Sequence, residues 1–180
     1  MRLEVPVTEG VSVSYADTVF KAEGSKGTVE KVLRHPNISI TIDGANIVLL
    51  ANNATKREKM NMGTFRAHIN NVMKGAAEGF VYELKICSGH FPMSAAVKGT
   101  KFELKNFLGE AFPRTLTLKE GAKVTVNADI ITVEANDKEL AGQVSADLEK
   151  LTKITNRDRR IFQDGIYITK KGDKVLADMK

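Results

Sequence analysis

The 180 residues suffice for one large or two small domains, and with 42% apolar side chains the chain is too apolar to be disordered. The longest apolar run, residues 47–51, excludes a membrane helix of roughly 20 residues, and the single cysteine excludes an internal disulfide. The net charge of +5 permits an anionic partner without establishing one. Because the first residues also lack the apolar stretch of a signal peptide, we expect a cytoplasmic protein.

Two segments of similar sequence lie 84 residues apart. Residues 40–53 and residues 124–137 align at that offset without gaps, and both alternate apolar and polar side chains around a turn-prone centre. Such alternation about residues that favour a turn is typical of a β-hairpin. A repeated hairpin indicates a duplicated domain.

An amphipathic helix is expected after each hairpin. Thr55, with Glu58 three residues later, matches a capping box, and the apolar residues beyond it recur at spacings of three and four. The second helix follows the same spacing between residues 140 and 151. The pattern predicts an α+β protein of two tandem, duplicated domains, each a mainly antiparallel β-sheet with one long helix packed on one face. The expected domains are residues 1–79 and residues 80–180.

Shorter landmarks also repeat. Residues 26–28 and residues 98–100 both have the sequence Lys-Gly-Thr, at an offset of 72 rather than 84. The difference predicts about a dozen extra residues in the second copy, which we place in residues 106–114. Residues 24–27 have the GxxG form of an RNA-binding KH loop, but their strand-like flanks favour a hairpin turn.

Sequence motifs of enzymes are absent. The chain has no Walker loop, no dinucleotide-binding fingerprint, no zincin helix and no nucleophile elbow. Cys87 and His90 are spaced like metal ligands, but two ligands make at most half a zinc site, so we interpret them as a thiol and a surface imidazole. We therefore predict a protein that is not an enzyme, with no catalytic residues, no metal and no cofactor.

Positive charge is concentrated near the C-terminal end. From Lys150 to Lys171 there are seven Lys or Arg and two Asp, an excess equal to that of the whole chain. Arg157, Arg159 and Arg160 are close enough to repel one another without an anionic partner. Because arginine presents a planar fork that fits a phosphate group, we predict that these residues bind nucleic acid.

Two aromatic residues follow the arginines. Phe162 is expected in the core, whereas Tyr167 is compatible either with stacking on a base or with core packing. Asp164 and Gly165 lie between them, at the start of a strand rich in β-branched residues. We expect this pair to shape the turn rather than to contact RNA.

The segment from Arg160 to Lys171 resembles the C-terminal signature of the L-six family of large-subunit ribosomal proteins, in its archaeal and eukaryotic form. The pattern R-x-F-x-D-G-(aliphatic)-(aromatic)-(aliphatic)-x-x-(basic) is met at every constrained position. Residues 105–110 resemble the N-F-L-G-E segment of the family, and residues 70–80 resemble its N-x-x-x-G-x-x-x-G-(aromatic) stretch. The resemblance covers nearly the whole chain, and the family is known for a duplicated fold.

The resemblance implies a structural constituent of the large subunit of the cytoplasmic ribosome, which supports translation. It implies binding to large-subunit rRNA near the stalk base and the sarcin–ricin loop, beside neighbouring large-subunit proteins and close to translational GTPase factors. Most rRNA contacts would come from the second domain. The implied rRNA-binding residues are Arg157, Arg159, Arg160, Tyr167, Lys170 and Lys171, with Lys105, Asn106 and Arg114 as weaker candidates.

Two other classes of function remain as alternatives. A nucleic-acid-processing enzyme would show activity on RNA in a purified preparation free of contaminating nuclease. A protein–protein adaptor that uses the N-terminal sheet would bind its partner without RNA and with little dependence on salt.

Overall fold

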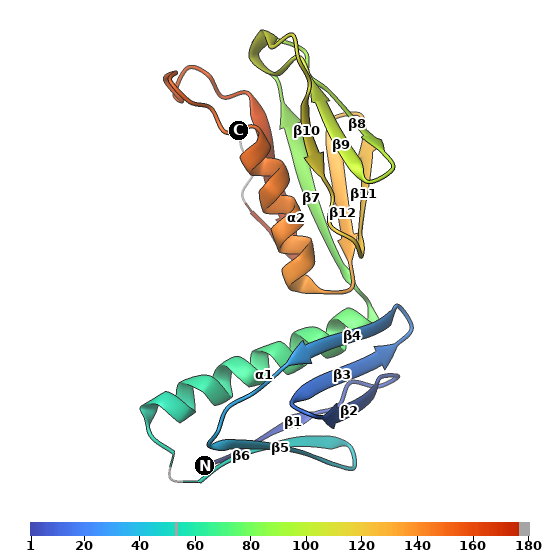
Figure 1. Cartoon of the computed structure of the whole chain (residues 1–180), viewed down its shortest axis with the longest axis vertical. Helices are drawn as coiled ribbons and strands as arrows, with labels where there is room; N and C mark the ends of the chain where they lie inside the picture. The colour runs from blue at the N-terminus through green and yellow to red at the C-terminus, as the bar shows by residue number, and fades with distance from the viewer. Residues whose placement is uncertain (53, 177–180) are drawn as a thin grey trace. The chain divides into compact units, whose positions relative to one another are not determined.

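The computed structural model describes residues 1–52 and 54–176 (Figure 1). The chain divides into two compact units. The first unit is residues 1–79 with residues 136–138, and the second unit is residues 80–135 with residues 139–180. Each unit combines antiparallel strands with a helix of several turns, which confirms the α+β class predicted from the sequence.

The strands of the first unit form two three-stranded antiparallel sheets, in the orders β1-β6-β5 and β2-β3-β4. The helix α1 (Lys56–Ala77) follows them in the chain and packs against β1, β3 and β4. The strands are β1 (Arg2–Pro6), β2 (Ser12–Ala16), β3 (Val19–Gly24), β4 (Gly27–Val32), β5 (Ile38–Asp43) and β6 (Asn46–Ala51).

The second unit has a three-stranded sheet of order β10-β9-β8 and a five-stranded sheet of order β11-β12-β7-β13-β14. Its helix is α2 (Lys138–Leu151), and a short 3-10 turn η1 (Phe107–Gly109) interrupts the loop between β9 and β10. The strands are β7 (Phe80–Cys87), β8 (Ser94–Lys98), β9 (Lys101–Lys105), β10 (Arg114–Thr117), β11 (Ala122–Asn127), β12 (Ile130–Ala135), β13 (Gly165–Lys171) and β14 (Lys174–Val175).

Strand pairing confirms the predicted repeat. β11 and β12 begin and end 84 residues after β5 and β6, and the order β1-β6-β5 recurs as β7-β12-β11. The order β2-β3-β4 recurs as β8-β9-β10. Asn53, the last residue of the first repeated segment, lies outside the described residues. In the parts of the chain that the structure describes, β13, β14 and the long β9–β10 loop have no counterpart in the first unit.

The two Lys-Gly-Thr landmarks are not equivalent, so the prediction that they mark one position in both copies is wrong. Residues 26–28 begin with the second residue of the β3–β4 turn, whereas residues 98–100 include the β8–β9 turn, whose counterpart joins β2 to β3. Both sequences supply a glycine with a positive φ, 127° at Gly27 and 60° at Gly99, which many hairpin turns require. The β9–β10 loop, residues 106–113, is six residues longer than the equivalent β3–β4 turn, residues 25–26. The extra residues therefore lie where we predicted them, but the predicted number of about a dozen is wrong because it rested on the false equivalence of the landmarks. The GxxG segment is a hairpin turn, as expected.

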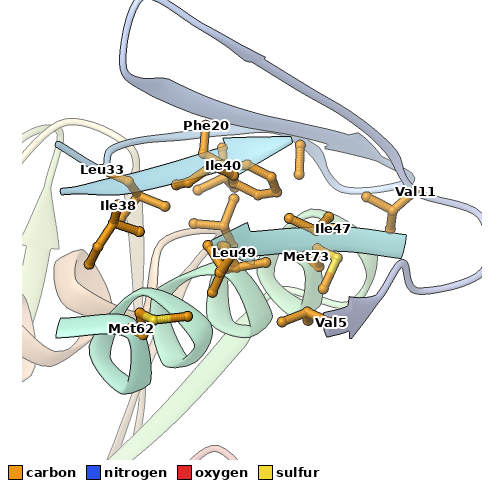
Figure 2. Close-up of a cluster of buried hydrophobic side chains, with 14 of the residues drawn as sticks. Val5, Val11, Phe20, Leu33, Ile38, Ile40, Ile47, Leu49, Met62 and Met73 are labelled. Carbon is orange, nitrogen blue, oxygen red and sulfur yellow. The ribbon is translucent and has the colours of Figure 1, made fainter. Parts of the chain in front are cut away.

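Each unit has its own hydrophobic core. Figure 2 shows the first core, in which Phe20 and Leu49 from the two sheets meet Met62 of α1. All three side chains are fully buried, and burial of each contributes about 1.5–3 kcal/mol to folding. In the second core, residues such as Phe102 and Ile131 pack with the apolar stripe of α2. The predicted helical stripes therefore face the cores.

The predicted capping box at the start of α1 is present. The Thr55 hydroxyl accepts a hydrogen bond from the Arg57 N–H at 3.2 Å, and the Glu58 carboxylate accepts from the Thr55 N–H at 3.0 Å and from the Thr55 hydroxyl. Asn37 adds a hydrogen bond at 3.2 Å to the same carboxylate. These bonds, the Thr55 hydroxyl first among them, lower the pKa of Glu58 from 4.5 to about 2.

Glu58→Gln is expected to abolish a pH-dependent part of the stability. Because the pKa of Glu58 is depressed in the folded state, its stabilisation is complete above pH 4.5 and is lost as the pH falls towards about 2. The melting temperatures of the parent and of Glu58→Gln, measured across this range, should therefore converge as the solution is acidified. A difference that stays constant down to the lowest pH would contradict the assignment.

Candidate nucleic-acid interface

A buried carboxylate joins two loops at one end of the second unit: residues 88–93, after β7, and residues 152–164, between α2 and β13. Asp164 Oδ1 accepts hydrogen bonds from the backbone N–H groups of Gly89 and His90, at 2.5 and 2.9 Å. Asp164 Oδ2 lies 2.6 Å from Nδ1 of His90. The two loops are therefore held together at three points.

The β9–β10 loop, residues 106–113, is joined to the same end. Asn106 Nδ2 donates to the Pro92 carbonyl at 2.9 Å, and Arg114 Nη1 donates to the Leu151 carbonyl at the end of α2 at 2.6 Å. Nε and Nη2 of Arg114 also donate to Glu110, at 2.8 and 2.6 Å. The guanidinium of Arg114 is thus committed to contacts within the chain.

Asp164 is only 1% exposed, so its charge requires hydrogen bonds to be tolerated. Burial raises the pKa of Asp164, but the backbone N–H of His90, the His90 side chain and the Gly89 N–H together lower it below its ordinary value. The carboxylate is therefore ionised at neutral pH. Asp164 shapes the loops, in agreement with the role expected from the sequence.

Phe162 does not belong to the second core, so its predicted burial there is wrong. The partly buried ring stacks on His90, with centroids 4.7 Å apart, and the guanidinium of Arg157 lies 4.9 Å from the centroid of the Phe162 ring. Stacking between an imidazole and a guanidinium covers the ring on the surface. The contact with the Phe162 ring restricts the position of Arg157. We expected His90 to be a surface imidazole, but its side chain contacts both Phe162 and Asp164.

Arg159 and Arg160 are both exposed on the loop of residues 152–164. Arg160 pairs with Asp158 at 2.8 Å although its side chain is 90% exposed, and this pair lowers the pKa of Asp158. Arg159 lines a hollow beside Tyr167. Arg157 contacts the Phe162 ring and Arg160 pairs with Asp158, so both have partners within the chain. Repulsion among the three arginines therefore does not by itself require an external anion, and this corrects the argument made from the sequence. Their exposure still leaves the guanidinium groups accessible to one.

The predicted site residues Lys170 and Lys171 lie at the C-terminal end of β13, whereas the loop that carries the arginines leads into its N-terminal end. The ladder with β7 pairs Gly165 with Cys87 and Lys171 with Tyr82, so Lys171 lies about 20 Å along the strand from Gly165 at about 3.3 Å per residue. Lys170 Nζ contacts Glu83 Oε1 at 3.3 Å. The predicted site residues therefore divide into two groups, because an extended strand separates residues that are close in sequence.

Two cations that were not named as site residues lie near the arginines. Lys150 and Lys153 line the same hollow as Arg159 and Tyr167. They contribute to the excess of positive charge seen in the sequence, but no motif distinguishes them from other surface lysines. Only the return of the chain from α2 to β13 brings them beside Tyr167.

Metal ligands and membrane-spanning helices are both absent from residues 1–52 and 54–176. No group of three or more His, Cys, Asp or Glu side chains there is arranged to hold a metal ion. Within the same residues, neither helix is long and apolar enough to cross a membrane. Cys87 is a free thiol at the end of β7.

Comparison with known proteins identifies the family. The family model of Ribosomal protein L6 matches residues 7–79 and residues 91–165. Large ribosomal subunit protein uL6 of Methanosarcina mazei is 43% identical over 169 residues, covering 94% of this chain and 95% of the relative. The uL6 protein of Methanococcus vannielii is 41% identical over 174 residues, covering 97% and 94%, and that of Haloarcula marismortui is 35% identical over 173 residues, covering 96% and 97%.

The chain belongs to the ribosomal protein L6 family. This confirms the resemblance found in the sequence, including its archaeal type. Proteins of the L6 family are structural proteins of the large ribosomal subunit, so the prediction that the chain is not an enzyme is also confirmed. The first matched segment falls in the first unit, and the second falls in the second unit except for residues 136–138.

Asp164→Ala is expected to loosen the loops that carry the arginines. It removes a buried hydrogen-bonding partner of Gly89 and His90 and should cost about 2–3 kcal/mol of unfolding free energy, because hydrogen bonds to a charged group are the stronger ones. Urea denaturation measures the loss. Asp158→Asn, in the exposed pair with Arg160, is the matched control and should change stability little. Equal stability of the two variants would refute the anchoring role of Asp164.

Proposed function

We propose that the chain binds large-subunit rRNA through its second domain, residues 80–180, with residues 1–79 as a separate N-terminal domain. The observation that carries this proposal is the exposure of Arg157, Arg159 and Arg160 on one loop, which a buried carboxylate joins to the loop after β7. Loops that are already ordered lose less conformational entropy on binding. The relatives are proteins of the large ribosomal subunit, which is built on rRNA.

The proposed mechanism is binding without turnover. Arginine and lysine side chains neutralise rRNA phosphates and release condensed counterions, so affinity falls as the salt concentration rises. Backbone and side-chain contacts then recognise the shape of the folded RNA more than its sequence. If six phosphates are engaged, log K should fall with log salt at a slope on the order of −4 to −5.

The candidate residues have different roles in this proposal. The three arginines and Lys105, which is exposed where β9 ends, contact phosphate groups. Asn106 and Arg114 hold the β9–β10 loop in place, since their polar atoms bond to Pro92, Leu151 and Glu110. Tyr167 contributes a ring surface. Lys170 and Lys171 form a second contact with RNA at the far end of β13.

The proposed location is the rRNA near the stalk base and the sarcin–ricin loop, on the cytoplasmic ribosome. The support for this location is the family resemblance of the segment from residue 160 to residue 171. Neighbouring large-subunit proteins are the expected protein partners, and translational GTPase factors would dock close by. Chemical footprinting of rRNA with the purified protein tests the location.

Replacing Arg157, Arg159 and Arg160 together by glutamine is expected to weaken binding to protein-free large-subunit rRNA. Each phosphate that the variant no longer neutralises should reduce the steepness of log K against log salt by about 0.7–0.9, or about 2–2.7 if all three arginines bind phosphate. A salt titration with small-subunit rRNA as competitor measures both affinity and slope. The variant should remain folded because all three side chains are exposed.

The matched control replaces Lys98, Lys101 and Lys119 by glutamine. Lys101 and the β8–β9 turn lie at the other end of β9 from the β9–β10 loop, about 13 Å along the strand from Lys105. This control should keep the affinity and slope of the parent. Full affinity in a folded arginine variant would overturn the proposed interface. Salt-insensitive binding of the parent to a protein partner, without RNA, would favour the adaptor function instead.

A further inference from the structure

A hollow of about 390 Å³ opens where the end of α2 faces the start of β13. Its wall includes the ring of Tyr167, and Lys150, Lys153 and Arg159 stand around it. Lys150 and Lys153 are exposed, and neither is part of the family signature that suggested the RNA-binding residues. The hollow therefore places two further cations, Lys150 and Lys153, beside the ring of Tyr167 and the guanidinium of Arg159.

The ring of Tyr167 is held in place by Gly165. The two residues lie on the same face of β13, and a Cβ atom on Gly165 would lie 3.2 Å from ring atoms Cε2 and Cζ of Tyr167. The ring therefore rests against glycine backbone, where a larger residue would force it to move. The Tyr167 hydroxyl donates to the Gln163 carbonyl at 3.2 Å, which fixes the other end of the ring.

The base of the hollow is equally well ordered. Thr152 is buried, and its hydroxyl donates to the Glu149 carbonyl at 3.1 Å and accepts from the Ile166 N–H at 2.9 Å. These bonds join the last turn of α2 to the first residues of β13. The aromatic wall and the backbone that carries the surrounding cations are therefore ordered before a ligand arrives.

The charge of the hollow favours an anion. Lys150, Lys153 and Arg159 carry three positive charges, and Glu149 carries one negative charge. The C-terminal end of α2 adds a partial negative charge of about half a unit, so the balance remains positive. Burial raises the pKa of Tyr167, so its phenol stays neutral at physiological pH and adds no negative charge. The remaining lining side chains, Thr152, Ile154 and Ile166, are uncharged.

We propose that this hollow binds one unstacked nucleotide of an RNA loop or bulge, with its base against Tyr167 and its phosphates at Lys150, Lys153 and Arg159. The inference rests on the proposed rRNA binding and adds a specific class of ligand. A base in a continuous RNA helix is stacked on both faces and cannot reach the ring, whereas an unpaired base can be turned outward. Free phosphate would use the cations but leave the ring without a role.

The test compares hollow variants in binding to large-subunit rRNA. Tyr167→Leu removes the stacking surface and should weaken binding roughly 5- to 150-fold, as expected for loss of base–aromatic stacking. Tyr167→Phe keeps the ring and should retain most of the affinity. The pair Lys150→Ala with Lys153→Ala should reduce the salt slope by about 1.8. Its matched control is Lys98→Ala with Lys101→Ala, at the β8–β9 turn.

Chemical probing of the RNA bases distinguishes direct stacking on Tyr167 from a purely structural role of this residue. Loss of a structural role would weaken the whole footprint, whereas loss of stacking would expose one base. The parent and Tyr167→Phe should protect one unpaired nucleotide at its base, and Tyr167→Leu should expose that nucleotide while the rest of the footprint stays. Circular dichroism confirms that each variant is folded. If Tyr167→Leu fails to fold, the exposed lysine pair decides the question by its salt slope and by loss of the same protection.

The outcomes separate this inference from the function on which it rests. A variant with only Arg157 and Arg160 replaced by glutamine leaves Arg159, and so the hollow, intact. If the hollow variants bind like the parent while this double variant is weakened, the proposed function stands and the nucleotide site is overturned. Protection confined to paired nucleotides would also overturn it. If the parent protein binds no large-subunit rRNA, the proposed function fails and the nucleotide site fails with it.

Discussion

The ionised carboxylate of Asp164, buried between two loops, sets the geometry on which the candidate interface depends. A buried charge is tolerated only when hydrogen bonds replace its hydration, and here Gly89 and His90 supply them. The requirement for these donors fixes the loop after β7 against the loop before β13. His90 in turn stacks on Phe162, which supports Arg157, so an exposed cation is positioned through a chain of contacts from a buried anion.

Duplication explains why the two units share a fold, whereas the additions to the second unit explain why it carries the candidate interface. Both copies repeat two three-stranded pairings and a helix, each with its own core. The second copy adds the long β9–β10 loop, the loop of residues 152–164 and β13. The exposed arginines lie on the loop of residues 152–164, and the β9–β10 loop is bonded to the same end of the unit. Because the repeated strands and helix already supply a hydrophobic core, the added loops can carry residues that bind a partner.

Predictions from the sequence succeeded where the physical cause is local. Thr55 and Glu58 are three residues apart, so one turn of helix brings their groups together whatever the rest of the chain does. The hairpins follow from period-two patterning, and the helical stripes follow from spacings of three and four. The placement of Phe162 failed because composition says that an aromatic ring is suited to burial, but not which partners will cover it.

The sequence by itself determined the fold class, the duplication, the long loop in the second copy and the family, because all of these are expressed in short-range patterns and motifs. Only the tertiary structure decided which cations act together. Pairing of β13 with β7 carries Lys171 about 20 Å along the strand from Gly165, where the arginine-bearing loop ends, while the return of the chain from α2 brings Lys150 and Lys153 beside Tyr167. Long-range backbone pairing sets these distances, and residue spacing along the chain does not encode them.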